Sequence, residues 1–146
     1  MIARLNVDGT LDAGFDIGTG IQGANAAIYA LTQQPDGKTL AGGSFVNVNN
    51  VPRRNLVRLN ADGSVDTSLD TGSGPSNFVD AIAVQADGKL LIGGGFLSVN
   101  GVPRLGLARL NNDGSVDPRF EPMLEFLGPV LVSSIALQPD GQILIG

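Results

Sequence analysis

The chain has 146 residues, of which 42% are hydrophobic and 16% charged, a balance typical of a folded globular domain. Fourteen acidic residues against nine basic ones give a net charge of −5, which makes nucleic acid and anionic membranes poor partners. The absence of cysteine and histidine excludes disulfides, thiolate zinc sites and hydrolases that use a histidine base.

The chain opens at Met1-Ile2-Ala3-Arg4 inside a repeated segment, without the basic and apolar leader of a signal peptide. No apolar run approaches the length of a membrane span. A segment that reads ALTQQPDGKTLAGGSF from residue 30 returns as AIAVQADGKLLIGGGF from residue 81 and as IALQPDGQILIG from residue 135. The turn residues Asp36, Asp87 and Asp140 lie 51 and 53 residues apart. A period of about 50 residues made of strands is typical of a propeller blade.

The second repeat shows the expected elements in order. We predict strands at 81–85, 89–99 and 102–110, and a short fourth strand at 115–120. Glycine at a bulged loop and Asn-Gly at a primed turn favour hairpins between them. The predicted hairpin turns are Asp36-Gly37, Asp87-Gly88, Asp140-Gly141 and Asn100-Gly101. Four antiparallel strands in a meander make one blade.

Both faces of these strands are apolar or small, since Ile82 and Val84 point one way and Ala81 and Ala83 the other. We therefore expect both faces to be covered by neighbouring blades. The run Gly93-Gly94-Gly95 lies on the second strand, where missing side chains allow a close backbone approach.

The fold class predicted from these patterns is all-β, a β-propeller of four-stranded antiparallel blades with about three blades per chain. The chain is one propeller domain or half-propeller with repeats at 2–56, 57–107 and 108–146. The N-terminal segment corresponds to strands three and four of a blade, and the C-terminal segment to strands one and two. These halves add up to one shared blade.

The motif R-L-N-x-D-G-S-x-D, followed by A-x-x-x-Q-x-D-G-K-x-x-x-G-G-x-F and V-N-x-V-P-R, resembles the delta-sixty repeat family, bacterial propeller repeats of undefined function. The resemblance covers nearly the whole chain and implies a scaffold with an unknown ligand, usually in secreted or cell-surface bacterial proteins. The diglycine is also similar to kelch repeats, but the aromatic signature that follows it there is absent.

Three blades are too few for a closed propeller, which needs about four to eight. Two copies supply six, and we expect a homodimer in which each shared blade combines the N-terminal half of one copy with the C-terminal half of the other. A fragment of a larger secreted repeat protein is the alternative.

Recurrent arginines and acids allow two interpretations. Register around each turn places Arg4 opposite Asp12, Arg58 opposite Asp66 and Arg109 opposite Asp117, as structural ion pairs. The alternative is bound calcium, with Asp62, Asp66, Asp113 and Asp117 as candidate ligands; no bidentate glutamate follows at the spacing of a calcium loop. No other cofactor is expected.

Two other groups of residues have open roles. Arg53, Arg54 and Arg104 follow Val-Pro and either clamp an anionic ligand or remain solvated. The apolar connector after Glu121 either caps the propeller mouth, binds a partner or packs in the core. Its candidates are Met123, Leu124, Phe126 and Leu127.

Catalysis would require a pair of carboxylates, since histidine and cysteine are absent. The available carboxylates are Asp12, Asp66, Asp70, Asp80, Glu121 and Glu125. Nothing in the spacing brings two of them together, so we expect no enzyme. The expected function is a non-catalytic scaffold or binding module that presents loops to a protein or other ligand. A carbohydrate-binding or carbohydrate-active propeller is the alternative.

Overall fold

The computed structural model describes residues 2–124 and 130–146, and these residues form strands, turns and loops without any helix. No helix in the described part of the chain could therefore cross a membrane. The strands in these ranges are β1 (Ile21–Gln22), β2 (Ala27–Gln33), β3 (Thr39–Ser44), β4 (Asn47–Val48), β5 (Val51–Pro52), β6 (Leu56–Leu59), β7 (Val79–Val84), β8 (Leu90–Gly94), β9 (Ser98–Val99), β10 (Val102–Pro103), β11 (Leu107–Leu110), β12 (Ile135–Leu137) and β13 (Ile143–Ile145).

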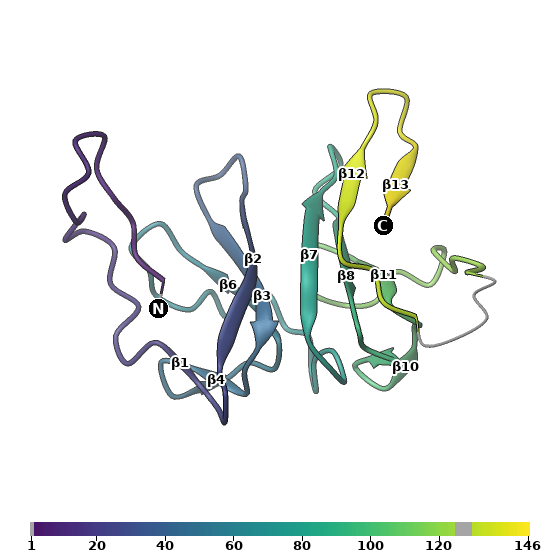
Figure 1. Ribbon diagram of the computed structural model, residues 1–146, viewed down its shortest axis with the longest axis horizontal. Helices are drawn as coiled ribbons and strands as arrows, with labels where there is room; N and C mark the ends of the chain where they lie inside the picture. Colours follow the sequence, from purple (N-terminus) through teal and green to yellow (C-terminus); the bar gives the residue numbers. More distant parts are fainter. Residues whose placement is uncertain (1, 125–129) are drawn as a thin grey trace.

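Two antiparallel three-stranded sheets form the centre of an open arc (Figure 1). Blade one has the order β2-β3-β6 and blade two the order β7-β8-β11. On one side of them lies the N-terminal hairpin, in which Leu5 bridges Leu11, and on the other side the hairpin β12-β13. The all-β prediction is confirmed.

The predicted second and third strands are each split in two. Residues 89–99 give β8 and β9, and residues 102–110 give β10 and β11, with β9 and β10 in a separate small sheet. The split occurs because Gly106 adopts a φ of 68° and donates its N–H to the Phe96 carbonyl, so the outer ends leave the main ladder. Phe96 is buried as a result.

The predicted fourth strand at 115–120 is reduced to one bridge, Leu110 to Val116. The Asp117 side chain accepts the Arg119 N–H at 2.9 Å, which turns the chain away from the sheet. The equivalent bridge in blade one joins Leu59 to Val65. The fourth position of each blade is thus a turn with one bridge.

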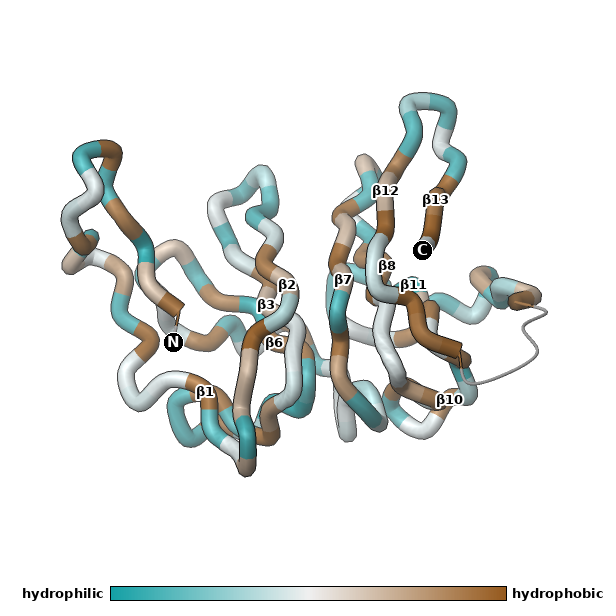
Figure 2. Tube along the Cα trace, in the orientation of Figure 1, coloured by the Kyte–Doolittle hydropathy of each residue, from teal (hydrophilic) through white to brown (hydrophobic). Residues whose placement is uncertain are grey.

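The hydrophobic core lies between the blades, so neighbouring sheets cover each other as expected. One cluster joins Leu40 and Leu56 of blade one to Val79, Leu90 and other residues of blade two. The second cluster joins the N-terminal segment to blade one through Ile2, Ile17, Ala41, Phe45, Val48, Val57 and Leu59. Figure 2 shows the corresponding alternation of hydrophobic strands and hydrophilic turns along the chain.

Glycines on the second strand allow the blades to approach closely. A Cβ on Gly42 would lie 2.7 Å from Cγ1 of Val79, and a Cβ on Gly93 would lie 2.8 Å from Cγ1 of Val132. These separations are too short for real side chains, so the interior faces require glycine here. Close approach of this kind brings the polar ends of neighbouring hairpins into contact.

Candidate functional site

Aspartate-glycine turns end the first strand of each repeat. Gly37, Gly88 and Gly141 have φ values of 85°, 82° and 87°. Each preceding aspartate accepts the N–H two residues further on, at 3.1 to 3.2 Å. These side-chain bonds fix the loop, because they replace backbone partners that the turn leaves unpaired.

The Asn100-Gly101 turn has positive φ at both positions, 49° and 74°, as a primed turn requires. Its counterpart in the first repeat is Asn49-Asn50, with φ values of 50° and 62°. Sequence reasoning missed this second turn because it lacks glycine. Asparagine tolerates the left-handed region well enough to replace it.

Each repeat brings together an arginine and an aspartate across the next hairpin. The Nε atoms of Arg4 and Arg58 lie 2.7 Å from Asp12 and Asp66, and Nε of Arg109 lies 3.0 Å from Asp117. Exposure differs strongly along the chain: the Arg58 side chain is 3% exposed and the Arg4 side chain 39%. Arg58 is therefore the most buried of the three arginines.

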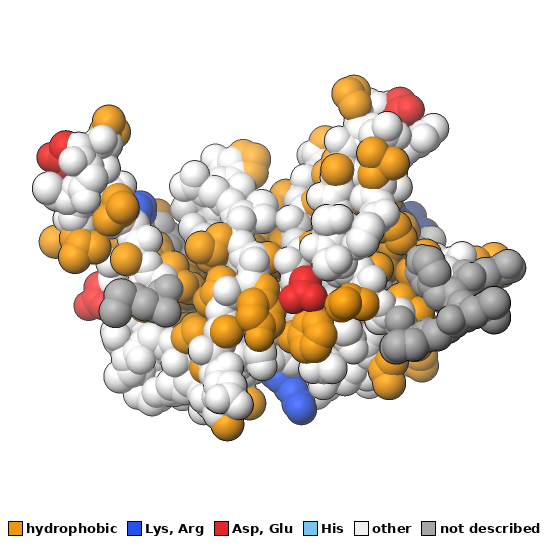
Figure 3. Space-filling model, viewed as in Figure 1, with side chains coloured by type: hydrophobic (Ala, Val, Ile, Leu, Met, Phe, Trp, Pro, Cys, Tyr) orange, Lys and Arg blue, Asp and Glu red, His pale blue; other side chains and the backbone are white. Residues whose placement is uncertain are grey.

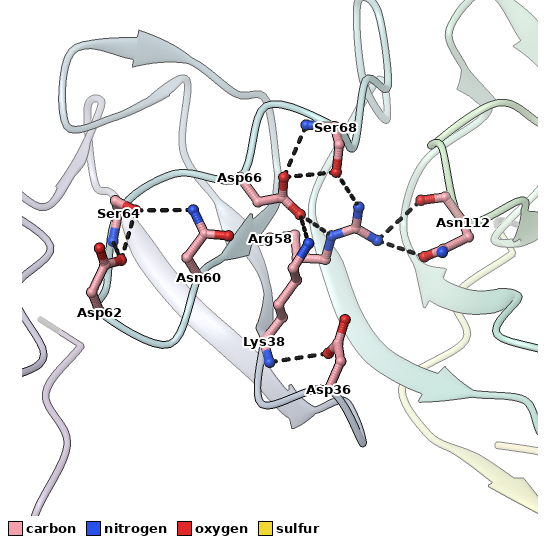
Figure 4. A network of polar contacts seen from close by, with 9 residues as sticks. All are labelled: Asp36, Lys38, Arg58, Asn60, Asp62, Ser64, Asp66, Ser68 and Asn112. Atoms are coloured by element: carbon pink, nitrogen blue, oxygen red, sulfur yellow. Dashed lines mark hydrogen bonds and ion pairs between the residues drawn. The ribbon is translucent and has the colours of Figure 1, made fainter.

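Two of these pairs each include a lysine as well, and Figure 4 shows the first of these lysines, Lys38, beside Asp66. Lys38 Nζ lies 2.8 Å from Asp66, and Lys89 Nζ lies 2.7 Å from Asp117. Sequence reasoning missed both lysines, although the Asp-Gly-Lys triplet in the first two of the three repeats marks them. Asp66 thus faces two cations, and Asp117 faces three, since Arg119 Nε also lies 3.8 Å from it.

The acids of these networks stay ionised. Burial opposes ionisation of Asp66, but hydrogen bonds from Lys38, Ser68 and Arg58 outweigh it and hold its pKa well below the usual value of 3.8. A hydrogen bond from Lys89, followed by the Arg119 N–H, lowers the pKa of Asp117 in the same direction.

Arg58 also connects blade one to blade two. Its Nη1 donates to the Asn112 carbonyl at 3.0 Å and to Asn112 Oδ1 at 2.7 Å, while Nη2 donates to Ser68 Oγ at 3.0 Å. Arg4 makes the equivalent contact one repeat earlier, from Nη1 to the Ala61 carbonyl at 2.6 Å. One guanidinium thus stabilises its own hairpin and holds the next blade (Figure 4).

Comparison with known families matches residues 2–15, 34–69 and 85–120 to the family described as "Domain of unknown function (DUF5122) beta-propeller". The matched segments cover more than half of the chain. The chain belongs to this family. Each matched segment of this chain includes one of the three arginine-aspartate hairpins. No curated protein matches the chain.

The calcium candidates in this DUF5122 propeller face donors from their own turns. Asp62 accepts hydrogen bonds from the Ser64 N–H and hydroxyl, at 2.9 and 2.6 Å, and Asp113 does the same with Ser115. Asp66 and Asp117 face the cations of their networks. Among the residues that the structure describes, no three carboxylates gather as a cation site would require.

The arginines after Val-Pro are held individually. Arg53 and Arg104 each donate from Nη1 to the carbonyl of the preceding proline at 2.8 Å, and Arg54 is exposed. Arg104 also lies 3.8 Å from Glu121. Within the described residues, these three arginines do not converge on one point, as an anion clamp would require.

The remaining carboxylates occupy separate surroundings. Asp70 accepts the Gly72 N–H at 2.8 Å, and burial raises the pKa of Asp80. Of the apolar connector, Met123 is 91% exposed, so it does not pack in the core. Glu125, Phe126 and Leu127 lie outside the described residues.

Clefts open between the hairpin turns of neighbouring blades. One cleft of about 480 Å³ lies between the turns of blades one and two, and its walls carry the amides of Gln33, Gln34, Gln85 and Asn112. Gln34 is 7% exposed, and within the described residues its Oε1 has no hydrogen-bond partner. This arrangement can bind a neutral ligand that donates hydrogen bonds.

Proposed function

We propose that the chain is a non-catalytic scaffold or binding module of the DUF5122 propeller family. The observation that carries this proposal is that the recurrent charged residues are used to hold hairpins and to link blades, as Arg58 does with Asp66 and Asn112. The finer resemblance to delta-sixty repeats, bacterial propeller repeats of undefined function, implies a scaffold as well. The ligand is a protein or another molecule held by the loops.

The propeller is completed by a second copy of the chain. Two three-stranded blades lie between two hairpins, and each hairpin is half a blade. Light scattering coupled to size exclusion tests this closure. We expect about 30 kDa, twice the 15.0 kDa of one chain. A compact monomer contradicts the closure, and a polydisperse profile indicates a part of a longer propeller.

Carbohydrate binding is the second candidate, favoured by the amide-lined cleft. Gln33, Gln34, Gln85 and Asn112 line this cleft, and sugar hydroxyls can donate hydrogen bonds to carboxamides and accept hydrogen bonds from them. Glycan titration with Gln34→Met as the test variant and Gln22→Met as the control examines this candidate. Saturable binding that only Gln34→Met abolishes supports it, whereas absence of saturable binding favours the scaffold alone.

A further inference from the structure

Contacts between neighbouring blades repeat with the same atoms. Arg4 donates to the Ala61 carbonyl, and one repeat later Arg58 donates to the Asn112 carbonyl. A second bond accompanies each: the Asp16 N–H donates to the Asp62 carbonyl at 2.9 Å, and the Asp70 N–H donates to the Asp113 carbonyl at 2.7 Å. These two bonds define a blade-to-blade contact that occurs twice within the chain.

The same positions recur once more without their partners. Arg109 and Glu121 stand where Arg58 and Asp70 stand, and among the described residues Arg109 hydrogen-bonds only to Asp117. At the other end, the turn at Val7 and Asp8 corresponds to the turns that accept these bonds, and Val7 is fully exposed. Among the described residues, the arc therefore carries donors without this contact at one end and acceptors without it at the other.

Glycines in these turns show the same difference. A Cβ on Gly63 would lie 2.6 Å from the Asp16 carbonyl oxygen, and a Cβ on Gly114 would lie 2.5 Å from that of Asp70. Gly9, at the equivalent position, has no neighbouring atom within 4 Å among the described residues. The Gly9 turn therefore has a positive φ, like the Gly63 and Gly114 turns, but no neighbouring turn packs against it among the described residues.

The half-blades expose apolar residues that the complete blades bury. Leu5 is 62% exposed, whereas its counterparts Leu59 and Leu110 are fully buried. Leu144 on β13 is 55% exposed, whereas its counterpart Leu91 is fully buried. Hydrophobic side chains are visible on the hairpin β12-β13 and on the N-terminal hairpin in Figure 3. Within the described residues, β13 pairs only with β12, so its other edge is free.

We propose that a second copy of this chain docks its N-terminal hairpin onto β13 in one defined register. In blade two, β11 pairs with β8 through Leu107 and Gly93, Ala108 and Ile92, Arg109 and Leu91, and Leu110 and Leu90. The equivalent pairs across the two copies are Ile2 with Gly146, Ala3 with Ile145, Arg4 with Leu144, and Leu5 with Ile143. This inference rests on the proposed closure of the propeller by a second copy, and it specifies which residues pair at the interface.

The polar contacts follow from the same equivalence. Arg109 donates to the Val7 carbonyl of the second copy, and the Glu121 N–H donates to its Asp8 carbonyl. A two-fold axis makes the same contact twice and leaves no unmatched donor or strand edge. A second copy fits because it supplies the apolar strand and the Asn-x-Asp-Gly turn together.

Leu5→Asp tests the interface, with Leu97→Asp as the matched control. Leu97 is 63% exposed, as Leu5 is, but it and its counterpart Val46 lie outside the expected contact, and Val46 stays 50% exposed in blade one. Because Leu5 is exposed in the single chain, the aspartate leaves the fold intact, which circular dichroism can verify. We expect Leu5→Asp to lower the mass from about 30 kDa to the 15.0 kDa of one chain, and Leu97→Asp to leave the dimer unchanged.

A disulfide tests the register, because the natural chain has no cysteine. Cysteines at Ala3 and Ile145 would face each other at about 5.5 Å between Cα atoms, within disulfide range. We expect oxidation of the double variant to give a covalent dimer, and the shifted pair Ala3→Cys with Ile143→Cys to give none. A wild-type monomer overturns the closure itself. A dimer that survives Leu5→Asp, or that forms no disulfide at this pair, overturns only the register.

Discussion

Two similar hairpin sequences occupy different surroundings in this propeller. In residues 56–66 it lies between blades, where Leu59 is fully buried and the Arg58 side chain is 3% exposed. In residues 2–12 it lies at one end of the arc, where Leu5 is 62% exposed and the Arg4 side chain 39%. The turn and ion pair are the same in both. Local sequence therefore determines the hairpin, and the neighbouring blade determines how much each contact stabilises it.

The largest expected difference concerns the leucines. Leu59→Ala leaves a cavity in a packed core and should lower the free energy of unfolding by about 3 to 4 kcal/mol. Leu5→Ala should have little effect at low protein concentration and a growing effect as copies associate. Urea unfolding at two protein concentrations measures both. Equal losses for the two variants at every concentration would contradict the comparison.

The next effect concerns the buried carboxylate. Asp66→Asn leaves Arg58 and Lys38 without their counter-charge and should cost about 3 kcal/mol. Asp12→Asn, the matched control, removes a half-exposed pair with one cation and should cost much less. Thermal melts at neutral pH measure the loss of stability in both variants. A larger loss for Asp12→Asn than for Asp66→Asn would contradict the prediction.

Acid should expose the same difference. The pKa values of Asp66 and Asp117 are lowered in the folded chain, so their contribution is fully present above the unfolded value of about 3.8 and is lost as the pH falls below it. We expect a flat melting temperature from pH 7 to about 5 and a fall below pH about 4. The Asp66→Asn variant should show a shallower fall, and a steeper one would argue against this origin.

Turn glycines give a smaller contrast. Gly9→Ala should cost about 1 kcal/mol, because its φ of 85° is unfavourable for alanine. Gly63→Ala has a φ of 90° and also meets the Asp16 carbonyl, so it should cost about 2 kcal/mol. Chemical denaturation of dilute samples, where single chains prevail, separates the two. An equal loss of unfolding free energy in the two variants would mean that the segment at Asp16 moves away from the new Cβ without loss of stability.

The smallest effect is a gain at the proposed interface. Gln142 stands where Lys38 and Lys89 bind their aspartates, and its expected partner is Asp12 of the second copy. Gln142→Lys should raise the association constant about twofold at low salt, with the gain lost at high salt. Sedimentation at two ionic strengths detects it. Weaker association of the Gln142→Lys variant would mean that Asp12 of the second copy does not lie beside residue 142.

Local chemistry made the turns and pairs predictable. Asp-Gly and Asn-Gly specify positive φ at fixed positions, and counting outwards from Asp62 places Arg58 opposite Asp66. The assignment to a propeller-repeat family and the covered sheet faces follow from the same repeats. These features depend on residues a few positions apart.

Long-range contacts were beyond the same reasoning. The bond from Arg58 to Asn112 spans 54 residues and depends on how two blades pack. The breaks near Phe96 and after Val116 arise where glycine and aspartate bonds compete with the ladder. The burial of the Gln34 Oε1 atom without a hydrogen-bond partner among the described residues is likewise a tertiary feature. Alternation of residue types carries no signal for these features.

The acceptor of the blade-to-blade bond is a main-chain carbonyl, and this choice has an evolutionary consequence. Ala61 and Asn112 provide it within the chain, and Val7 is the acceptor in the proposed dimer; these three residues have different side chains. Because every amino acid has that carbonyl, the main-chain part of the connection tolerates mutation at this site, although at Asn112 the side-chain oxygen adds a second acceptor for Arg58. Blades built this way are interchangeable modules, and a gene duplication that adds or removes one unit would preserve every joint.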